Sequence, residues 1–563
     1  MALNAHKNLF MRIKFSIFIC LFPLFLAADS IEYYYWVSFR DKACAESRNG
    51  FKQPELFLSK RSILKKYAAG TGITHDDLPV CPKYVNELKM QGMSIPFTSR
   101  WLNAAFVVLQ DTAAVVAISK MDFVTSVMPL GYKTLKSVDS SDNAVTGMME
   151  ENSIPVKTEP TKGSMYGAAK DQITQLKVDE LHRKGFTGNG IQIAVLDAGF
   201  YKANKMQLFD SLFLQGRMII SYDYVDHETN VFNDDDHGMQ VLSCIAANKP
   251  GIMVGTAPGA SFMLFRTEDA SVEMPYEEAF WVRAAEQADA LGADIITSSL
   301  GYTTFDDDRY NHKLSDLNGK TTLISRGAAM AAGRGILLVS SAGNEGDVSW
   351  GKLAVPADAE PVIAVAAVDK DGEVAGFSSR GPTADGRIKP DVAAMGKRTA
   401  VASASGYIVK SNGTSYSAPL MAGALASAMQ YSGMSATQLR KTLLADKLPD
   451  TLTGYGIPDF SAAKWKPVLP PKSHQVADPR FTHWVPGDTL YLPFVIGTKF
   501  SPEKHWSYKL SCDCGKVWQQ APLERVTSDW YGTIIAPVAT GLHFLEVTDG
   551  KTVFKESFYY YAP

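Results

Sequence analysis

Four short apolar runs in the middle of the chain constrain its fold most strongly. They comprise residues 191–196, 294–297, 335–340 and 361–366. Runs this short and this apolar are typical of strands covered on both faces, as in a parallel sheet with helices outside. Residues 276–291 repeat apolar side chains at helical spacing, and Gly292 is a helix stop. We therefore predict an α/β domain with a parallel sheet and helices on both faces.

Three of these runs end in residues that can bind a ligand or carry chemistry. The residues at these ends are Asp197, Ser299, Leu300, Gly301, Ala342, Gly343 and Asn344. In a parallel α/β sheet, ligands bind beyond the carboxyl ends of the strands. Because the three run ends lie at that edge, we expect these residues to share one cleft.

Two further residues complete a set for acyl transfer. Ser415 begins a helix rich in small residues, where free backbone N–H groups and the helix dipole favour negative charge. His237 begins another apolar helix at the rim of the predicted sheet. Acyl transfer from an amide needs a nucleophile, a base, a group that orients the base, and donors for the oxyanion. Ser415, His237, Asp197 and Asn344 offer one of each.

These motifs follow one another in the order Asp, His, Ser, and they resemble the signatures of the subtilases, a family of serine peptidases. They read Val195-Leu196-Asp197-Ala198-Gly199, His237-Gly238, Ser299-Leu300-Gly301, Ala342-Gly343-Asn344 and Gly413-Thr414-Ser415. The resemblance covers residues 166–464 and implies a subtilisin-like fold. It also implies hydrolysis of polypeptide substrates through an acyl-enzyme.

The resemblance assigns a role to each catalytic candidate. Ser415 would attack the scissile carbonyl, and His237 would act first as general base and then as general acid. Asp197 would hold the imidazole of His237. Asn344 would donate a hydrogen bond to the oxyanion.

The resemblance also predicts how substrate binds. Residues 299–301 would pair with the substrate backbone as an added strand. Residues 342–343 would form one wall of the primary side-chain pocket, and Ala354 would line its base. Small residues at these positions leave room for a large apolar side chain.

Three positions depart from the family pattern. The residue after Asp197 is Ala198, where Ser or Thr is usual, so one hydrogen bond to the carboxylate is expected to be missing. Met239-Gln240 follow His237-Gly238 where many relatives read Thr-His, and Met395 stands where Pro is often found. None of these changes removes a catalytic role, but the first is expected to lower activity.

Composition divides the whole chain into five segments. They are a signal peptide at 1–28, a propeptide-like domain at 29–136, a linker at 137–163, the catalytic domain at 164–466 and a small all-β domain at 467–563. The first has basic residues before an apolar run that is too short to span a bilayer. We therefore expect export to the extracellular space or periplasm, with no membrane span after the signal is removed.

Residues 99–104 resemble part of a subtilase propeptide. They lie in a segment with aromatic-rich strands, such as residues 33–37, and with a helix expected near residues 113–120. The resemblance implies that this domain assists folding, inhibits the enzyme and is removed by self-cleavage in or near residues 137–164. The chain's own propeptide is therefore an expected partner.

Charge and cysteine content limit the remaining partners. A net charge of −3 with mixed signs gives no reason to expect nucleic acid or an anionic membrane as partner, and we expect a monomer. Cys44 and Cys81 could pair in an oxidising compartment, which the sequence leaves open. Cys244 lies in an apolar helical stretch and is expected to be a buried free thiol.

Acidic runs at 234–236 and 306–308 raise the question of metal binding. We interpret both as helix caps and solvated loops, because Asp is favoured at such positions, and we assign no metal ligand. The chemistry requires no cofactor. A calcium site stays open and unassigned.

Two other classes of function remain as alternatives. One is a subtilase scaffold that has lost activity and acts as a binding protein, which Ala198 and Met239 suggest. The other is an esterase of the α/β-hydrolase type, but its Gly-x-Ser-x-Gly motif fails at Ser417. The sequence therefore predicts a secreted serine endopeptidase that processes itself.

Overall fold

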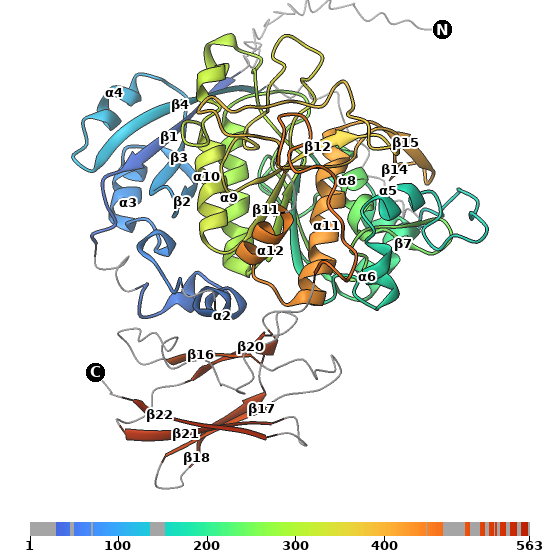
Figure 1. Cartoon of the computed structure of the whole chain (residues 1–563). Helices are drawn as coiled ribbons and strands as arrows, with labels where there is room; N and C mark the ends of the chain where they lie inside the picture. The colour runs from blue at the N-terminus through green and yellow to red at the C-terminus, as the bar shows by residue number, and fades with distance from the viewer. Residues whose placement is uncertain are drawn as a thin grey trace, which may run out of the picture.

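A computed structural model of the chain describes residues 30–44, 50–68, 71–135, 153–445 and 448–465, and seven strands between residues 490 and 560. The expected signal peptide lies outside the described residues, as does most of the expected linker. Figure 1 shows a large central domain with a smaller N-terminal domain against one side of it. Among the described helices, none combines the length and apolar character that a bilayer span needs.

A seven-stranded sheet forms the centre of the large domain, in the order β13-β12-β11-β10-β5-β9-β6. Every neighbouring pair is parallel, which confirms the predicted sheet. The strands are β5 (Gln192–Asp197), β6 (Met218–Asp223), β9 (Ser261–Arg266), β10 (Ile295–Ser298), β11 (Leu337–Ser341), β12 (Ile363–Val368) and β13 (Val392–Met395).

Helices cover both faces of this sheet, and side chains of β5 show why. Ile193 and Val195 belong to the core beneath one layer of helices, whereas Ala194 and Leu196 belong to the core beneath the other. Successive side chains of a strand point to opposite faces, so a strand buried on both sides is apolar throughout. One layer contains α8 (His237–Ala246) and α11 (Thr414–Ser432), and the other contains α9 (Tyr276–Leu291) and α10 (Leu323–Gly333).

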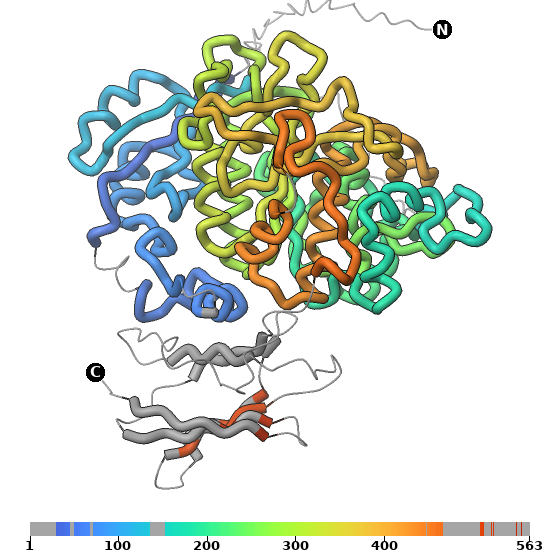
Figure 2. The backbone as a smooth tube through the Cα atoms, viewed as in Figure 1, coloured from blue at the N-terminus to red at the C-terminus, as the bar shows by residue number. Residues whose placement is uncertain are grey.

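The N-terminal domain packs a four-stranded antiparallel sheet, of order β2-β3-β1-β4, onto the layer of α9 and α10. Tyr34, Trp36 and Phe106 share one core with Phe280 of α9, so the interface is continuous with the interior of the large domain. Figure 2 shows this domain in blue along one side of the chain. Its elements are β1 (Ser30–Phe39), α2 (Lys60–Ala68), α3 (Pro82–Met90), β2 (Ser94–Ser99), β3 (Ala104–Leu109), α4 (Ala114–Ser119) and β4 (Val124–Leu135).

A disulfide joins Cys44 and Cys81 within this domain, which answers the question that the sequence left open. Cys244 is a buried free thiol, as expected. The expected helix near residues 113–120 is present as α4.

Residues 153–163 lie against the large domain, although their polar composition predicts only a linker. The backbone of Ile154 bonds with Lys205 and Gln207, and the N–H of Lys157 donates to the carbonyl of Gly406. The side chains of Ile154 and Val156 also pack against the large core. Pairing through main-chain groups requires no apolar pattern, so composition gives no sign of it.

The C-terminal segment contains antiparallel strands, as expected for a small all-β domain. They form two sheets, of order β16-β20-β19 and β18-β17-β21-β22. The strands are β16 (Leu490–Val495), β17 (Ser507–Cys512), β18 (Val517–Pro522), β19 (Glu524–Arg525), β20 (Trp530–Ile535), β21 (Gly541–Thr548) and β22 (Val553–Tyr560).

Shorter elements complete the large domain. They are α5 (Lys170–Gln175), α6 (Asp179–Arg183), α7 (Asp210–Leu214), α12 (Ala436–Leu443), β7 (Asn248–Lys249), β8 (Met253–Val254), β14 (Thr399–Ala402) and β15 (Ile408–Ser411). Single 3-10 turns are η1 (Pro54–Leu56), η2 (His75–Asp77), η3 (Ala203–Lys205), η4 (Gln207–Phe209), η5 (Asp308–Tyr310) and η6 (Leu314–Asp316).

Candidate active site

Asp197 is the last residue of β5 and is fully buried. Its Oδ1 accepts the Ala198 N–H at 2.9 Å and lies 2.6 Å from Nδ1 of His237. Its Oδ2 is buried and has no hydrogen-bond partner among the described residues. The sequence predicts that one hydrogen bond to this carboxylate is missing, because Ala198 has no hydroxyl group. The structure agrees with that expectation.

His237 is the first residue of α8, and its N–H donates to Asp235 Oδ1 at 2.7 Å. Gly238 permits the close approach of this helix to β5, because a Cβ there would lie 2.4 Å from the Gly199 carbonyl oxygen. Burial is the largest single influence and lowers the pKa of His237, but the charge and hydrogen bond of Asp197, together with the charges of Asp235 and Asp236, outweigh it and leave that pKa raised. The bond to Asp197 also leaves Nε2 as the ring atom available to a substrate or nucleophile.

Ser415 is the second residue of α11, as the sequence predicts. Its hydroxyl donates to the Ser299 carbonyl at 3.3 Å, and the Ser299 hydroxyl donates to the Ser415 carbonyl at 2.8 Å. Pro419 lies four residues after Ser415 and has no N–H, so the helix itself cannot supply a donor to that carbonyl. Ser299 therefore holds the first turn of α11 against the end of β10.

Asn344 is exposed at the end of the segment that follows β11. Its Oδ1 accepts from the N–H and the hydroxyl of Thr414, at 2.9 and 3.0 Å. A backbone N–H can only donate, so these bonds identify the oxygen of the amide and leave its N–H₂ group as the donor beside Ser415.

Three of the predicted substrate-binding residues, Gly301, Ala342 and Gly343, lie around Ala354. A Cβ on Gly301 would lie 2.7 Å from the Ala354 Cβ, and a Cβ on Gly343 would lie 3.1 Å from the same atom. The N–H of Ala354 donates to the Ala342 carbonyl at 3.0 Å. Ala354 therefore lies between Gly301 and residues 342–343, and the side-chain pocket that the sequence predicts there stays a prediction.

The other departures from the family pattern have structural roles. Met239 is fully buried in the core beneath α8 and α11. The Gln240 side chain accepts from the Tyr416 hydroxyl at 2.8 Å and donates to Asp236 at 3.0 Å. Gln240 thus connects the helix that carries His237 to the residue after Ser415. Met395 is buried in β13.

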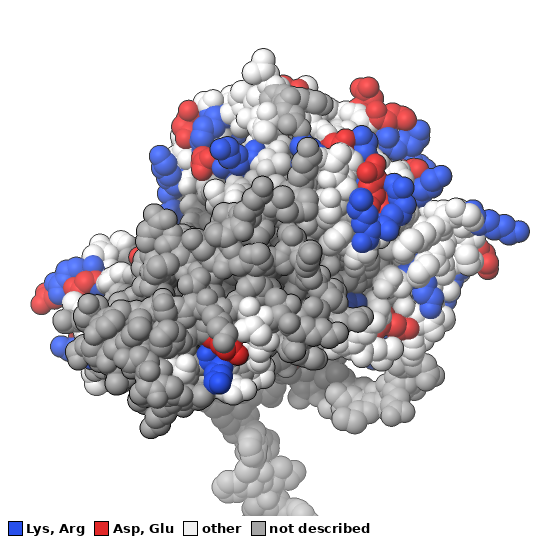
Figure 3. Space-filling view, turned by 60° about the horizontal axis from the view of Figure 1, so that its bottom comes forward, with Lys and Arg blue, Asp and Glu red and all other residues white. Residues whose placement is uncertain are grey.

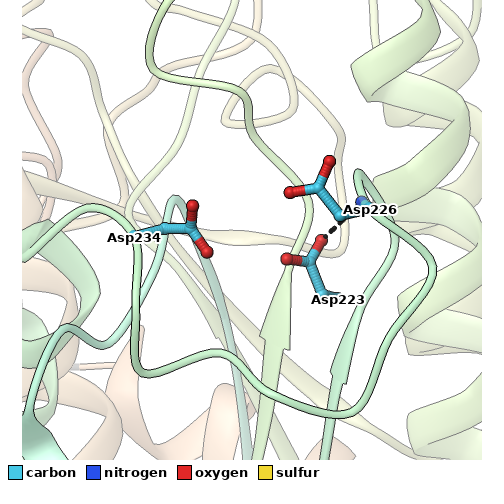
Figure 4. Close-up of side chains that lie close together, drawn as sticks. All are labelled: Asp223, Asp226 and Asp234. Atoms are coloured by element: carbon cyan, nitrogen blue, oxygen red, sulfur yellow. Dashed lines mark hydrogen bonds between the residues drawn. The ribbon is translucent and has the colours of Figure 1, made fainter. Parts of the chain in front are cut away.

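One acidic cluster surrounds an arginine that the sequence analysis missed. Figure 4 shows Asp223 and Asp226 close together, with Asp234 facing them from a separate loop. Nη1 of Arg266 lies 2.7 Å from Asp223, 2.7 Å from Asp226 and 3.6 Å from Asp234. Its Nε donates to the Ala198 carbonyl at 3.1 Å and so holds the turn after Asp197. In the sequence, only the position of Arg266 at the end of an apolar strand could have indicated this cluster.

A second acidic cluster contains Glu268, Glu273 and Glu277, whose carboxylate oxygens lie within 4.8 Å of one another. The Tyr302 hydroxyl donates to Glu268. Burial raises the pKa of Glu273 to about 7 and raises the pKa values of Glu268 and Glu277 above their usual range.

The acidic runs noted in the sequence have the expected local roles only in part, because Asp234 faces the buried Arg266 and Asp236 makes no side-chain capping bond. Asp235 accepts the His237 N–H, and Asp236 is the N-cap residue of α8. Asp307 caps η5 by accepting the Arg309 N–H.

Comparison with known proteins adds two family matches. A model described as "Subtilase family" matches residues 188–460, which hold every candidate catalytic residue. A model described as "Peptidase S8 propeptide domain, Bacteroidota" matches residues 34–145.

Relatives of known name match the same large domain. Subtilisin of Bacillus pumilus is 30% identical over 259 residues, which are 45% of this chain and 82% of that protein. Subtilisin E of Bacillus subtilis is 30% identical over 259 residues, but the chain spans only 59% of its length. Subtilisin-like protease SBT6.1 of Arabidopsis thaliana is 28% identical over 270 residues, 46% of this chain and 23% of that protein.

A solved structure shares the fold. The epidermin leader peptide processing serine protease of Staphylococcus aureus matches with a TM-score of 0.51 and 16% identity. The match covers 77% of this chain and 98% of that one. At this identity the likeness extends to the fold alone.

Proposed function

The chain belongs to the subtilase family, and we propose that it is a serine endopeptidase that hydrolyses peptide bonds through an acyl-enzyme. The observation that carries this proposal is the 2.6 Å contact between His237 Nδ1 and the buried Asp197. The ring of His237 also lies 6.2 Å, centroid to centroid, from the ring of Tyr416, the residue that follows Ser415. A carboxylate in that place fixes the tautomer of the imidazole and stabilises the imidazolium that forms.

The proposed acylation step begins when the Ser415 hydroxyl exchanges its bond to the Ser299 carbonyl for one to Nε2 of His237. Oγ then forms a bond to the scissile carbonyl carbon while Nε2 accepts the proton. The carbonyl oxygen becomes an oxyanion, to which the Asn344 amide and the Ser415 N–H donate. When the carbon–nitrogen bond breaks, His237 returns the proton to the leaving amine.

Water completes the proposed cycle. It attacks the acyl carbon while His237 accepts one of its protons, and a second oxyanion forms at the same donors. Collapse of this intermediate releases the carboxylic acid, and His237 returns the proton to Ser415. Substrate would be held by main-chain pairing with residues 299–301, with a side chain near Ala354.

We further propose that the enzyme is exported and processes itself, acts as a monomer and requires no cofactor. The Cys44–Cys81 disulfide supports export, because such bonds persist in oxidising compartments. Figure 3 shows Lys, Arg, Asp and Glu of the described residues interspersed on the face in view, which does not favour a nucleic acid or an anionic membrane as partner. Polypeptides are the proposed substrates, and the propeptide domain is the proposed inhibitor.

The unpartnered Oδ2 of Asp197 is the one observation that favours a scaffold without activity. A fluorophosphonate probe separates the two functions, because it bonds only to an activated serine. We expect labelling of the mature protein and of Ser417→Ala, in which a neighbouring buried serine is removed, and no labelling of Ser415→Ala. A mature protein that resists the probe and leaves casein uncut would contradict the proposal. Faster cleavage of a long-chain ester than of casein would favour an esterase.

A further inference from the structure

The two helices that carry His237 and Ser415 lie against each other. α8 begins at His237, and α11 has Ser415 in its first turn. Eight residues further along each helix, a Cβ on Gly423 of α11 would lie 3.0 Å from Cγ2 of Ile245 of α8. The helices therefore touch about 12 Å beyond the ends that carry the catalytic candidates.

This contact does not by itself fix the separation of the two N-terminal ends. The helices share a core of apolar side chains that includes Met239, Ile245 and Leu420, and hydrophobic attraction has no preferred direction. A tilt of about 5° around a contact about 12 Å away moves the end of a helix by about 1 Å. A misplacement of that size in a catalytic group can cost about 100-fold in rate. The N-terminal ends therefore need a directional contact of their own.

The hydrogen bond from the Tyr416 hydroxyl to Gln240 Oε1, at 2.8 Å, is such a contact. Within the part of the chain that the structure describes, no other side-chain hydrogen bond joins α8 to α11. Gln240 lies one turn after His237, and Tyr416 directly follows Ser415. The ring of Tyr416 also lies 6.2 Å from the ring of His237. The bond therefore lies beside both catalytic candidates.

The direction of each neighbouring bond follows from the Asp236 carboxylate. A carboxylate can only accept, so the N–H₂ group of Gln240 faces it, at 3.0 Å. The Gln240 oxygen then faces the Tyr416 hydroxyl, which donates to it. A lone pair of that hydroxyl is left to accept from the Ser411 hydroxyl at 3.0 Å, at the end of β15. One chain of hydrogen bonds thus joins the start of α8 to the start of α11.

Burial keeps this chain of bonds intact. Tyr416 is only 5% exposed, and a buried hydroxyl that loses its partner is unfavourable. Burial also raises the pKa of Tyr416 to about 12, so the hydroxyl keeps its proton and remains a donor near neutral pH. The Gln240 amide does not titrate, unlike the His that many relatives carry at this position. The bond therefore keeps one direction as the pH changes.

We propose that Tyr416 and Gln240 are a positioning pair, which fixes the imidazole of His237 relative to the Ser415 hydroxyl. That hydroxyl donates to the Ser299 carbonyl in the structure, so acylation requires it to turn toward Nε2 of the imidazole. The pair holds the ring at the place to which the hydroxyl turns. Neither side chain contacts substrate in the proposed mechanism, and both act through α8. This inference rests on the proposed function, because it assigns the pair a role in attack by the serine.

A cycle of single and double variants tests the pair through kcat, measured on a soluble peptide with an active-site titrant. Tyr416→Phe removes the hydroxyl and keeps the ring beside His237, whereas Gln240→Met keeps the length of the side chain. Each should lower kcat about tenfold and leave KM within about twofold, since one hydrogen bond is worth about that factor. Because both act through one bond, the double variant should also lose only about tenfold. A double variant that loses about 100-fold, the product of the single effects, would overturn the pair, as would near-normal kcat in either single variant.

Ser427→Ala is the matched control. Ser427 is a buried residue of the same helix, about three turns after Ser415, and its hydroxyl donates to the Thr256 carbonyl at 2.9 Å. Its loss should lower thermal stability but leave kcat within about twofold. An equal loss of kcat in Ser427→Ala and Tyr416→Phe would reduce the effect to general stability and overturn the proposal. Thermal unfolding checks each variant, and if Gln240→Met does not fold, Gln240→Asn, which shortens the side chain, replaces it in the cycle.

The acid limb of the kcat/KM profile gives a second reading. Burial lowers the pKa of His237, whereas the charges of Asp197, Asp235 and Asp236 raise it, and Tyr416→Phe changes none of these. The limb should therefore stay in place while kcat falls at every pH. A limb that moves would mean that Tyr416 acts on the charge of the imidazole and not on its place.

A measurement that needs no hydrolysis separates this inference from the proposed function. In the full chain with Ser415→Ala and isotope-labelled histidine, the NMR signal of the His237 ring is assigned among the ten histidines by its loss in His237→Gln. Tyr416→Phe and Gln240→Met should alter this signal alike, with no further change in the double variant and none in Ser427→Ala.

The two failures are then distinct. A chain that resists the fluorophosphonate probe but shows this coupled NMR response would refute the proposed activity alone. A labelled, active enzyme in which the two variants act independently on the signal and on kcat would refute the positioning pair alone.

Discussion

Asn344→Leu should lower kcat by about 10² to 10³ and change KM only a few-fold. Two bonds from Thr414 fix the oxygen of the Asn344 amide, so the side chain presents its N–H₂ group in one orientation. An ordered donor of this kind acts more strongly on the oxyanion than on the bound carbonyl, and its loss appears in kcat. The magnitude is that known for loss of such a donor in subtilisin itself.

The assay measures kcat and KM on a soluble peptide, with an active-site titrant to count competent enzyme. Asn344→Asp is a useful companion variant, because it keeps an oxygen for the Thr414 N–H while it removes the donor. It should lose at least as much activity as Asn344→Leu, since it also places negative charge beside the oxyanion. Both should fold, because Asn344 is exposed. Near-normal kcat in either variant would mean that Asn344 is a structural turn residue and that the oxyanion donor lies elsewhere.

Three further predictions concern the triad. Ala198→Ser should raise kcat/KM about threefold to tenfold by giving the orphaned Oδ2 of Asp197 a donor, and an unchanged value would show that this oxygen needs none. A protonated His237 cannot act as a base, so kcat/KM should fall as the pH drops through the raised pKa of His237. In Asp197→Asn the carboxylate that raises this pKa is gone, so the acid limb of the profile should move to lower pH while kcat falls; a limb that stays in place would assign it to another group. Ser415→Ala should accumulate as uncut precursor on a gel, and a mature form from that purified variant alone would exclude self-processing.

The positions of the candidate catalytic residues could be predicted because each obeys a local rule. Asp197 ends an apolar strand run, and His237 and Ser415 begin helices. A parallel sheet places the carboxyl ends of its strands along one edge, so residues that are distant in sequence meet there without any long-range information. The resemblance to a family then assigned roles that position alone does not distinguish.

Arg266, by contrast, could not be placed from the sequence. Its partners Asp223 and Asp226 lie on another strand and in a loop, and no periodic pattern joins them to it. The docking of residues 153–163 could not be predicted for a related reason. The segment is held by main-chain hydrogen bonds, which require no apolar residues, so its polar composition gives no sign of the contact. The Cys44–Cys81 pair also depends on the fold of the intervening chain rather than on spacing.

The acidic end of α9 is different, because its sequence does contain a signal. Glu286 and Asp289 lie where the helix dipole favours cations, and no residue of the last turn offers one. A local rule that is broken at a buried position indicates that a distant part of the molecule supplies the compensation. For α9 the compensation is Lys66 and Arg100, more than 180 residues earlier in the chain. Asp289 lies in the last turn of α9, and Asp294 lies just before β10. Both carboxylates lack a local cation, so together they indicate a surface that basic residues from elsewhere in the chain cover.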